Sequence, residues 1–165
     1  LTEAARKAIR VPGKRYSAGP ANNVNYYVDG RFLFCELPCG RSLAYCDPQI
    51  KSLPAPWDKS QRIDTITYKG VNSYSRKWEM LTTYGGKLAE NVVQAVARDF
   101  LVEGMFRIEK AGYPIVGTVH DEIVCEVDSA FGSTTDFERL LDLVPHWGGG
   151  CPVASEVFEA ERCRK

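Results

Sequence analysis

Residues 115–127 read Ile-Val-Gly-Thr-Val-His-Asp-Glu-Ile-Val-Cys-Glu-Val, two short β-branched runs with three polar residues between them. β-Branched residues favour strands, and the polar residues leave room only for a tight connection, so the pattern predicts a β-hairpin. Its tip would carry His120, Asp121 and Glu122. Carboxylates presented there suggest a metal ion acting on a phosphate, because magnesium prefers hard oxygen ligands. The alternative is an exposed turn with three solvated polar side chains.

A long helix is predicted just upstream of this hairpin, from Gly85 or Gly86 to about Lys110, because residues 84–101 repeat apolar side chains about every 3.6 residues. Four polar side chains at i, i+4, i+7 and i+11 share one narrow face, the polar stripe: Lys87, Asn91, Gln94 and Arg98. Glu90 stands beside it. Two cations and two amides in one line suit phosphate, sugar or base-edge contacts, and the alternative is an ordinary solvated helix face.

The rest of the chain predicts short helices and strands. An opening helix over residues 1–10 ends at Pro12-Gly13, and strands over 23–28 and 31–36 flank an Asp29-Gly30 turn. The other expected elements are a strand over 41–45, interruptions at Pro48, Pro54 and Pro56, a strand over 64–68 closed by a turn at Lys69-Gly70, irregular chain to about Thr83, a helix from about Phe137 and a strand over 152–158.

Composition indicates a globular chain, with 44% hydrophobic and 25% charged residues. The 21 basic and 21 acidic residues cancel, so any nucleic-acid contact must rest on local charge. The six cysteines form no C-x-x-C pair and only two histidines are present, which argues against zinc and favours reduced thiols. No apolar run is long enough to cross a bilayer, so no membrane partner is expected. Because the chain opens at Leu1, already in a predicted helix, we expect it to be truncated upstream.

Four motifs occur in order along the chain: Leu37-Pro38-Cys39-Gly40-Arg41-Ser42-Leu43-Ala44-Tyr45, the helix from Tyr84 to Asp99, Val119-His120-Asp121-Glu122, and Pro145-His146-Trp147 followed by Cys151 to Glu156. Together they resemble the C-terminal part of family A DNA polymerases, most closely the bacteriophage and prophage branch. The resemblance implies an α+β fold with an antiparallel palm-type sheet and packed helices, a fragment of a larger polymerase fold. Residues 1–55 would be a fingers-to-palm connecting segment with a β-ribbon, and residues 56–165 a C-terminal palm segment.

The resemblance also implies a function and a site. The full-length parent would be a DNA-directed DNA polymerase that transfers nucleotides to a primer 3′-hydroxyl, using two Mg²⁺ ions. Asp121 would bind metal, Glu122 would take a secondary catalytic role, and the DNA-binding residues would be His120, Gln94, Lys87, Asn91 and Arg98. For Arg98, pairing with a core carboxylate is the alternative. Expected partners are primer–template DNA, a deoxynucleoside triphosphate and the missing N-terminal part of the same polymerase, in the cytoplasm of a bacterial host.

Two parts of the family pattern do not occur in these residues: the first metal-binding aspartate, in a D-Y-S-x-I-E-like strand, and the fingers helix that receives the triphosphate. We therefore expect the chain alone to be inactive. Two alternatives remain open. One is a non-catalytic DNA-binding remnant of a prophage polymerase. The other is an unrelated metal-dependent hydrolase using His120, Asp121 and Glu122, which would need a second cluster of metal ligands.

Overall fold

The computed structural model describes residues 1–19 and 21–162. The chain divides into two compact units, Leu1–Gln94 and the part from Ala95 onward, and the division falls within the long helix α2 (Gly85–Lys110). The predicted helix is confirmed. This division does not coincide with the predicted boundary between residues 55 and 56. The assignment of residues 1–55 and 56–165 to two parts of a polymerase stays a prediction.

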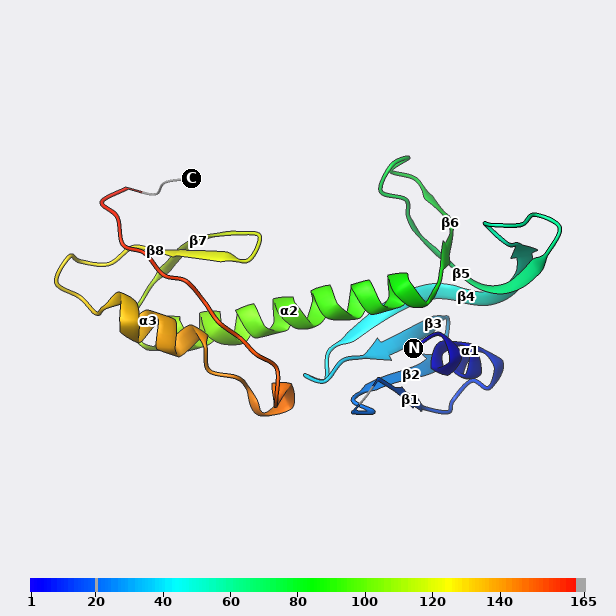
Figure 1. The fold of residues 1–165 in the computed structure, drawn as a ribbon, viewed down its shortest axis with the longest axis horizontal. Coiled ribbons are helices and arrows are strands. Elements are labelled where there is room, and N and C mark those ends of the chain that lie inside the picture. Colours follow the sequence, from blue (N-terminus) through cyan, green and yellow to red (C-terminus); the bar gives the residue numbers. More distant parts are fainter. Residues whose placement is uncertain (20, 163–165) are drawn as a thin grey trace. The chain divides into compact units, whose positions relative to one another are not determined.

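The first unit is built on an antiparallel sheet in which each strand pairs with its neighbours in the chain (Figure 1). The predicted hairpin around Asp29-Gly30 is confirmed, and Gly30 has the positive φ of 54° that such a tight turn requires. The chain is thus α+β, while the palm-type assignment of the sheet stays a prediction. The six strands are β1 (Tyr16–Ala18), β2 (Val24–Asp29), β3 (Phe32–Glu36), β4 (Ser42–Pro54), β5 (Arg62–Val71) and β6 (Trp78–Thr83).

Helix α1 (Thr2–Arg10) confirms the predicted opening helix and packs on strands β1 to β4. Its buried face consists of alanines, which let the helix approach the sheet closely. Beneath it, Tyr26 and Cys35 are fully buried cross-strand partners, and burial raises the pKa of both side chains. The cysteines among the described residues form no disulfide with one another, and their role as reduced apolar residues stays a prediction.

Strand β4 runs through Pro48, which was predicted to interrupt it, but ends at Pro54 and does not reach Pro56. Pro48 lies in a bulge, where the pairing with β5 shifts between Cys46 and Gln49, so its missing N–H costs no ladder hydrogen bond. Asp47 beside it has a positive φ of 48°. Two cations clamp the Asp47 carboxylate: Arg31 at 2.8 Å and 2.7 Å, and Lys69 at 3.0 Å. The bulge is therefore held by charge as well as by the ladder.

Two further predictions in this unit are wrong. Gly70 lies inside β5, paired with Glu79, and does not form a turn. Strand β6 occupies part of the segment that was expected to be irregular. The reason is that Trp78 and Met80 on its exposed face are apolar, which hides the alternation that normally marks a half-buried strand.

The second unit contains the rest of α2, the hairpin of β7 (Ile115–Val119) and β8 (Glu122–Cys125), helix α3 (Thr134–Leu141) and a 3₁₀ turn, η1 (His146–Gly148). Helix α3 begins earlier than predicted because Ser133 caps it, its Oγ accepting from the Asp136 N–H at 3.1 Å. Residues 152–158 form no strand. Ser155 instead donates its N–H and its hydroxyl to Asp142, at 2.7 Å and 2.8 Å.

Tyr113 is the packing centre of this unit. Its ring makes edge contacts with Phe131 and Phe137, each at 5.0 Å between centroids, and its hydroxyl accepts from the Ser133 N–H at 3.2 Å. Arg107 of α2 donates to the last carbonyls of α3, reaching Leu140 O at 2.8 Å. None of the helices among residues 1–19 and 21–162 combines the length and the apolar character needed to cross a lipid bilayer.

Candidate functional site

The predicted hairpin tip is present. Val119 pairs with Glu122, so His120 and Asp121 form the two-residue connection between β7 and β8. His120 has a positive φ of 55°, as tight two-residue connections require, and histidine tolerates this region better than a β-branched residue does. The backbone therefore fixes the direction in which the tip residues are presented.

All three tip side chains, those of His120, Asp121 and Glu122, are exposed to solvent. A magnesium ion often takes only one or two protein carboxylates and keeps several waters, so Asp121 fits as one ligand of such a site. Among the described residues no group of three His, Cys, Asp or Glu side chains is placed to hold a metal. The metal-binding role of Asp121 stays a prediction.

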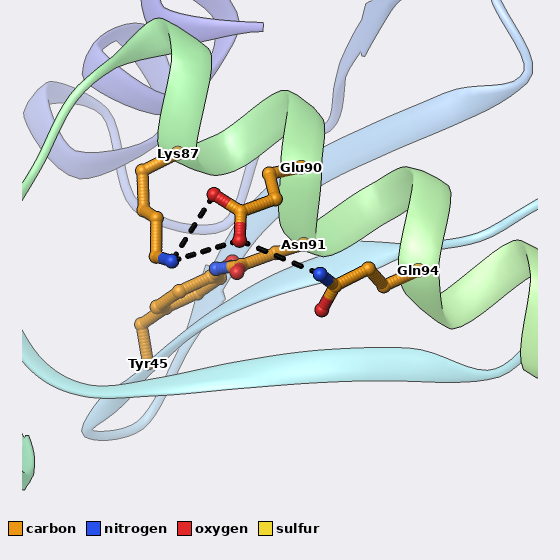
Figure 2. Close-up of polar contacts among 5 residues, drawn as sticks. All are labelled: Tyr45, Lys87, Glu90, Asn91 and Gln94. Carbon is orange, nitrogen blue, oxygen red and sulfur yellow. Dashed lines mark hydrogen bonds and ion pairs between the residues drawn. The ribbon is translucent and has the colours of Figure 1, made fainter. Parts of the chain in front are cut away.

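In the first unit, Lys87 of the polar stripe forms an ion pair with the neighbouring Glu90. Lys87 Nζ lies 3.0 Å and 3.1 Å from the two carboxylate oxygens of Glu90 (Figure 2). The hydrogen bond that Lys87 donates to the Glu90 carboxylate raises the pKa of Lys87. Both side chains are about half exposed, 47% and 48%. Exposed ion pairs of this kind contribute little free energy, so Lys87 can exchange Glu90 for a phosphate at small cost.

Glu90 also organises the amide of Gln94, whose Nε2 donates to Glu90 Oε1 at 3.4 Å. Figure 2 shows the Lys87, Glu90 and Gln94 side chains converging beside the helix. The sequence analysis gave Glu90 no role in the site. Its contacts with Lys87 and Gln94 could have been predicted from spacing, because residues three and four positions apart are neighbours on a helix surface.

Asn91 is held differently from its stripe neighbours. Its Nδ2 donates to the Tyr45 hydroxyl at 3.1 Å, and Tyr45 is only 5% exposed. Burial raises the pKa of Tyr45 to about 12, and the hydrogen bond from Asn91 opposes that rise. Asn91 therefore has a structural partner, and its predicted DNA contact stays a prediction. Tyr45 is a residue that sequence reasoning did not connect to the stripe, although it ends the Leu37–Tyr45 motif.

The structure brings Lys87, Glu90, Asn91 and Gln94 together within the first unit. Arg98 is exposed and belongs to the second unit, as do His120, Asp121 and Glu122. The predicted site residues are therefore distributed over both units. Each group presents exposed polar side chains to solvent.

Comparison with known proteins bears on what these groups do. Over 158 residues the chain is 34% identical to a protein named DNA polymerase from Bacillus phage SP02. The chain is related to a phage DNA polymerase. The similarity covers 96% of this chain and 24% of the phage protein, so the chain spans about a quarter of that relative's length. No protein-family model matches the chain, and no solved structure matches it. The polymerase part of the predicted resemblance is confirmed, while family A membership stays a prediction.

Proposed function

We propose that the chain is a palm segment of a phage-type family A DNA polymerase, which adds nucleotides to a primer 3′-hydroxyl as directed by a template. The observation that carries the proposal is the similarity to a phage DNA polymerase, which extends over 96% of the chain. That extent includes both the polar stripe and the acidic hairpin tip, so one function accounts for both groups.

Asp121 is the proposed metal ligand. It projects from a two-residue connection whose backbone is fixed by the β7–β8 pairing, and its carboxylate is exposed. Two bound Mg²⁺ ions would supply activation of the primer hydroxyl and neutralise charge on the leaving pyrophosphate. Glu122 begins strand β8, and because alternate residues of a strand point to opposite faces it serves a secondary, positioning role. His120 contacts the primer backbone.

The polar stripe is the proposed DNA-binding face. Lys87 releases Glu90 to bind a phosphate, and Arg98 binds another. Gln94, oriented by Glu90, reaches the minor groove, where acceptors recur at correctly formed base pairs of any sequence. Such a contact senses the shape of a pair without reading its identity. The proposed partners are primer–template DNA, a deoxynucleoside triphosphate and the remainder of the polymerase, in the cytoplasm of a bacterial host.

Neither alternative function gains a specific observation in its favour. A metal-dependent hydrolase at His120, Asp121 and Glu122 would need a second ligand cluster, and residues 1–19 and 21–162 contain no group of three metal-binding side chains. A non-catalytic remnant would share the DNA-binding stripe but would not depend on Asp121. The Asp121→Asn substitution therefore distinguishes a polymerase segment from a remnant that only binds DNA.

The test is a chimera in which the aligned segment of the Bacillus phage SP02 polymerase is replaced by this chain. We expect Mg²⁺-dependent primer extension by the chimera and none by the 165-residue chain alone. Asp121→Asn should lower extension by roughly 100-fold or more, because a metal ion supplies several kcal/mol of charge stabilisation. Affinity for primer–template DNA should be nearly unchanged, since only one charge at the metal is removed.

Asp128→Asn provides a matched control, because Asp128 is an exposed aspartate in the same unit, just beyond β8. It should leave extension unaffected. Wild-type extension by the Asp121→Asn chimera would refute the metal role. A chimera that binds primer–template DNA but extends no primer would refute the assignment of this chain to the polymerase active region, and synthesis by the isolated chain would refute its expected inactivity.

A further inference from the structure

The connection between β5 and β6 carries aromatic side chains that the proposed function leaves unused. Tyr74 is 96% exposed, and Trp78, the first residue of β6, is 61% exposed. Figure 1 shows this connection projecting from the sheet of the first unit. Large aromatic side chains that remain in water mark interaction surfaces when they gather in one place.

The connection has a definite, hydrogen-bonded conformation. Asn72 organises it: its Oδ1 accepts from the N–H groups of Tyr74 at 2.8 Å and Ser75 at 3.3 Å. Its own N–H donates to Lys77 O, and its carbonyl accepts from the Arg76 N–H, both at 2.9 Å. Tyr74 is therefore presented outward by an ordered turn, which lowers the entropic cost of using it for binding.

The strands below the turn extend this surface. Trp78 pairs with Val71, and Met80 pairs with Lys69. Because alternate residues of a strand share a face, Trp78 and Met80 lie on one side of the hairpin together with their cross-strand partners. Val71, Trp78 and Met80 are all exposed apolar residues. The surface is thus partly apolar and lies next to the turn.

Two cations complete the group. Arg76 and Lys77 are exposed, and neither forms an ion pair with another of the described residues. The nearby carboxylate of Glu79 is engaged by the Asn72 amide and by the Ser75 hydroxyl, the latter at 3.3 Å. The positive charge of the turn is therefore available to an anion.

We propose that the β5–β6 turn, defined by Tyr74, Arg76, Lys77 and Trp78, binds single-stranded DNA. Bases stack on Tyr74 and Trp78, while phosphates pair with Arg76 and Lys77, which is the combination used for single strands without sequence preference. The inference depends on the proposed function in one respect, which is that the single strand bound in the cell would be unpaired template DNA. A covering protein segment fits less well, because it would leave two cations facing an apolar contact.

The test measures binding of a fluorescein-labelled oligothymidylate to the 165-residue chain by anisotropy, without divalent ions. Tyr74→Ala and Trp78→Ala should each weaken binding roughly 5- to 150-fold, the loss expected for one stacked base. Tyr74→Phe and Trp78→Phe retain an aromatic ring and should bind nearly as the unmodified chain does. Phe158→Ala is the matched control, because Phe158 is 74% exposed but lies between Glu156 and Glu159.

The cations are tested by salt dependence. Each phosphate contact to a single strand contributes about 0.7 to the slope of log affinity against log salt concentration, so the double variant Arg76→Gln/Lys77→Gln should reduce that slope by about 1.4. The aromatic variants should leave the slope unchanged. Circular dichroism of each variant checks that the sheet is intact.

Each remaining outcome overturns the inference. If the chain binds the oligothymidylate and the variants of the β5–β6 turn bind equally well, the binding site lies elsewhere. If the chain does not bind the oligothymidylate at all, the β5–β6 turn is not a DNA site. If the variants instead disrupt association with the remainder of the polymerase, the surface is a protein interface. None of these results affects the chimera experiment, which depends on Asp121 and primer extension.

Discussion

The hydrogen bond between Asn91 and Tyr45 should stabilise the first unit, and its removal tests the structural role of a stripe residue. The bond joins residues 46 apart in the chain, from helix α2 to strand β4, at 3.1 Å. The Tyr45 ring is also packed edge-on against Tyr68, with 5.0 Å between centroids. The Tyr45 hydroxyl therefore has little freedom to find another partner.

The expected magnitude follows from burial. Asn91→Ala leaves the hydroxyl of the 5% exposed Tyr45 without this donor, a desolvation loss of about 1–3 kcal/mol. The better helix propensity of alanine returns about 0.5 kcal/mol. Tyr45→Phe removes the acceptor instead and should cost about 1 kcal/mol, because the half-buried Asn91 amide can partly turn to water. The double variant should show a coupling free energy of about 1 kcal/mol.

Urea unfolding followed by tryptophan fluorescence measures these values in a Trp147→Phe background. The two tryptophans that remain, Trp57 and Trp78, both lie in the first unit and report its unfolding. Additive single variants, with a coupling free energy within about 0.3 kcal/mol of zero, would refute the reasoning. If Asn91→Ala leaves stability unchanged and weakens DNA binding, Asn91 is a DNA contact and not a structural residue.

Two further predictions concern stability. The hydrogen bonds from its two cationic partners lower the pKa of Asp47 from 3.8 to about 2, so the stability it contributes is present above about pH 4 and is lost as pH falls toward 2. Asp47→Asn should flatten the dependence of the urea midpoint on pH in that window, and an unchanged profile would contradict the clamp. In the second unit, a Cβ at Gly148 would overlap the Phe100 ring, so Gly148→Ala should lower the free energy of unfolding by about 1–3 kcal/mol. Gly117→Ala meets open space and serves as control in the same thermal unfolding measurement, where equal effects of the two changes would rule out the clash.

The elements that could be predicted from the sequence are those specified by local pattern. Helix α2 follows from its apolar period, and the β7–β8 hairpin follows from two β-branched runs around His120 and Asp121. The pairing of Glu90 with Lys87 and Gln94 belongs to the same class, because it depends only on spacing along a helix. The same reasoning failed at Pro48, which β4 passes through in a bulge, and at β6, whose exposed face is apolar.

Sequence alone determined which groups reach solvent at the hairpin tip and along the helix, because backbone periodicity within a few residues sets those directions. Tertiary structure decided the rest. It turned Asn91 toward Tyr45, allowed β4 to pass Pro48 by means of a charge-clamped bulge, and left Tyr74 exposed on an ordered turn. Each of these outcomes depends on partners or packing contributed from other parts of the chain, and side-chain pattern within one segment carries no information about them.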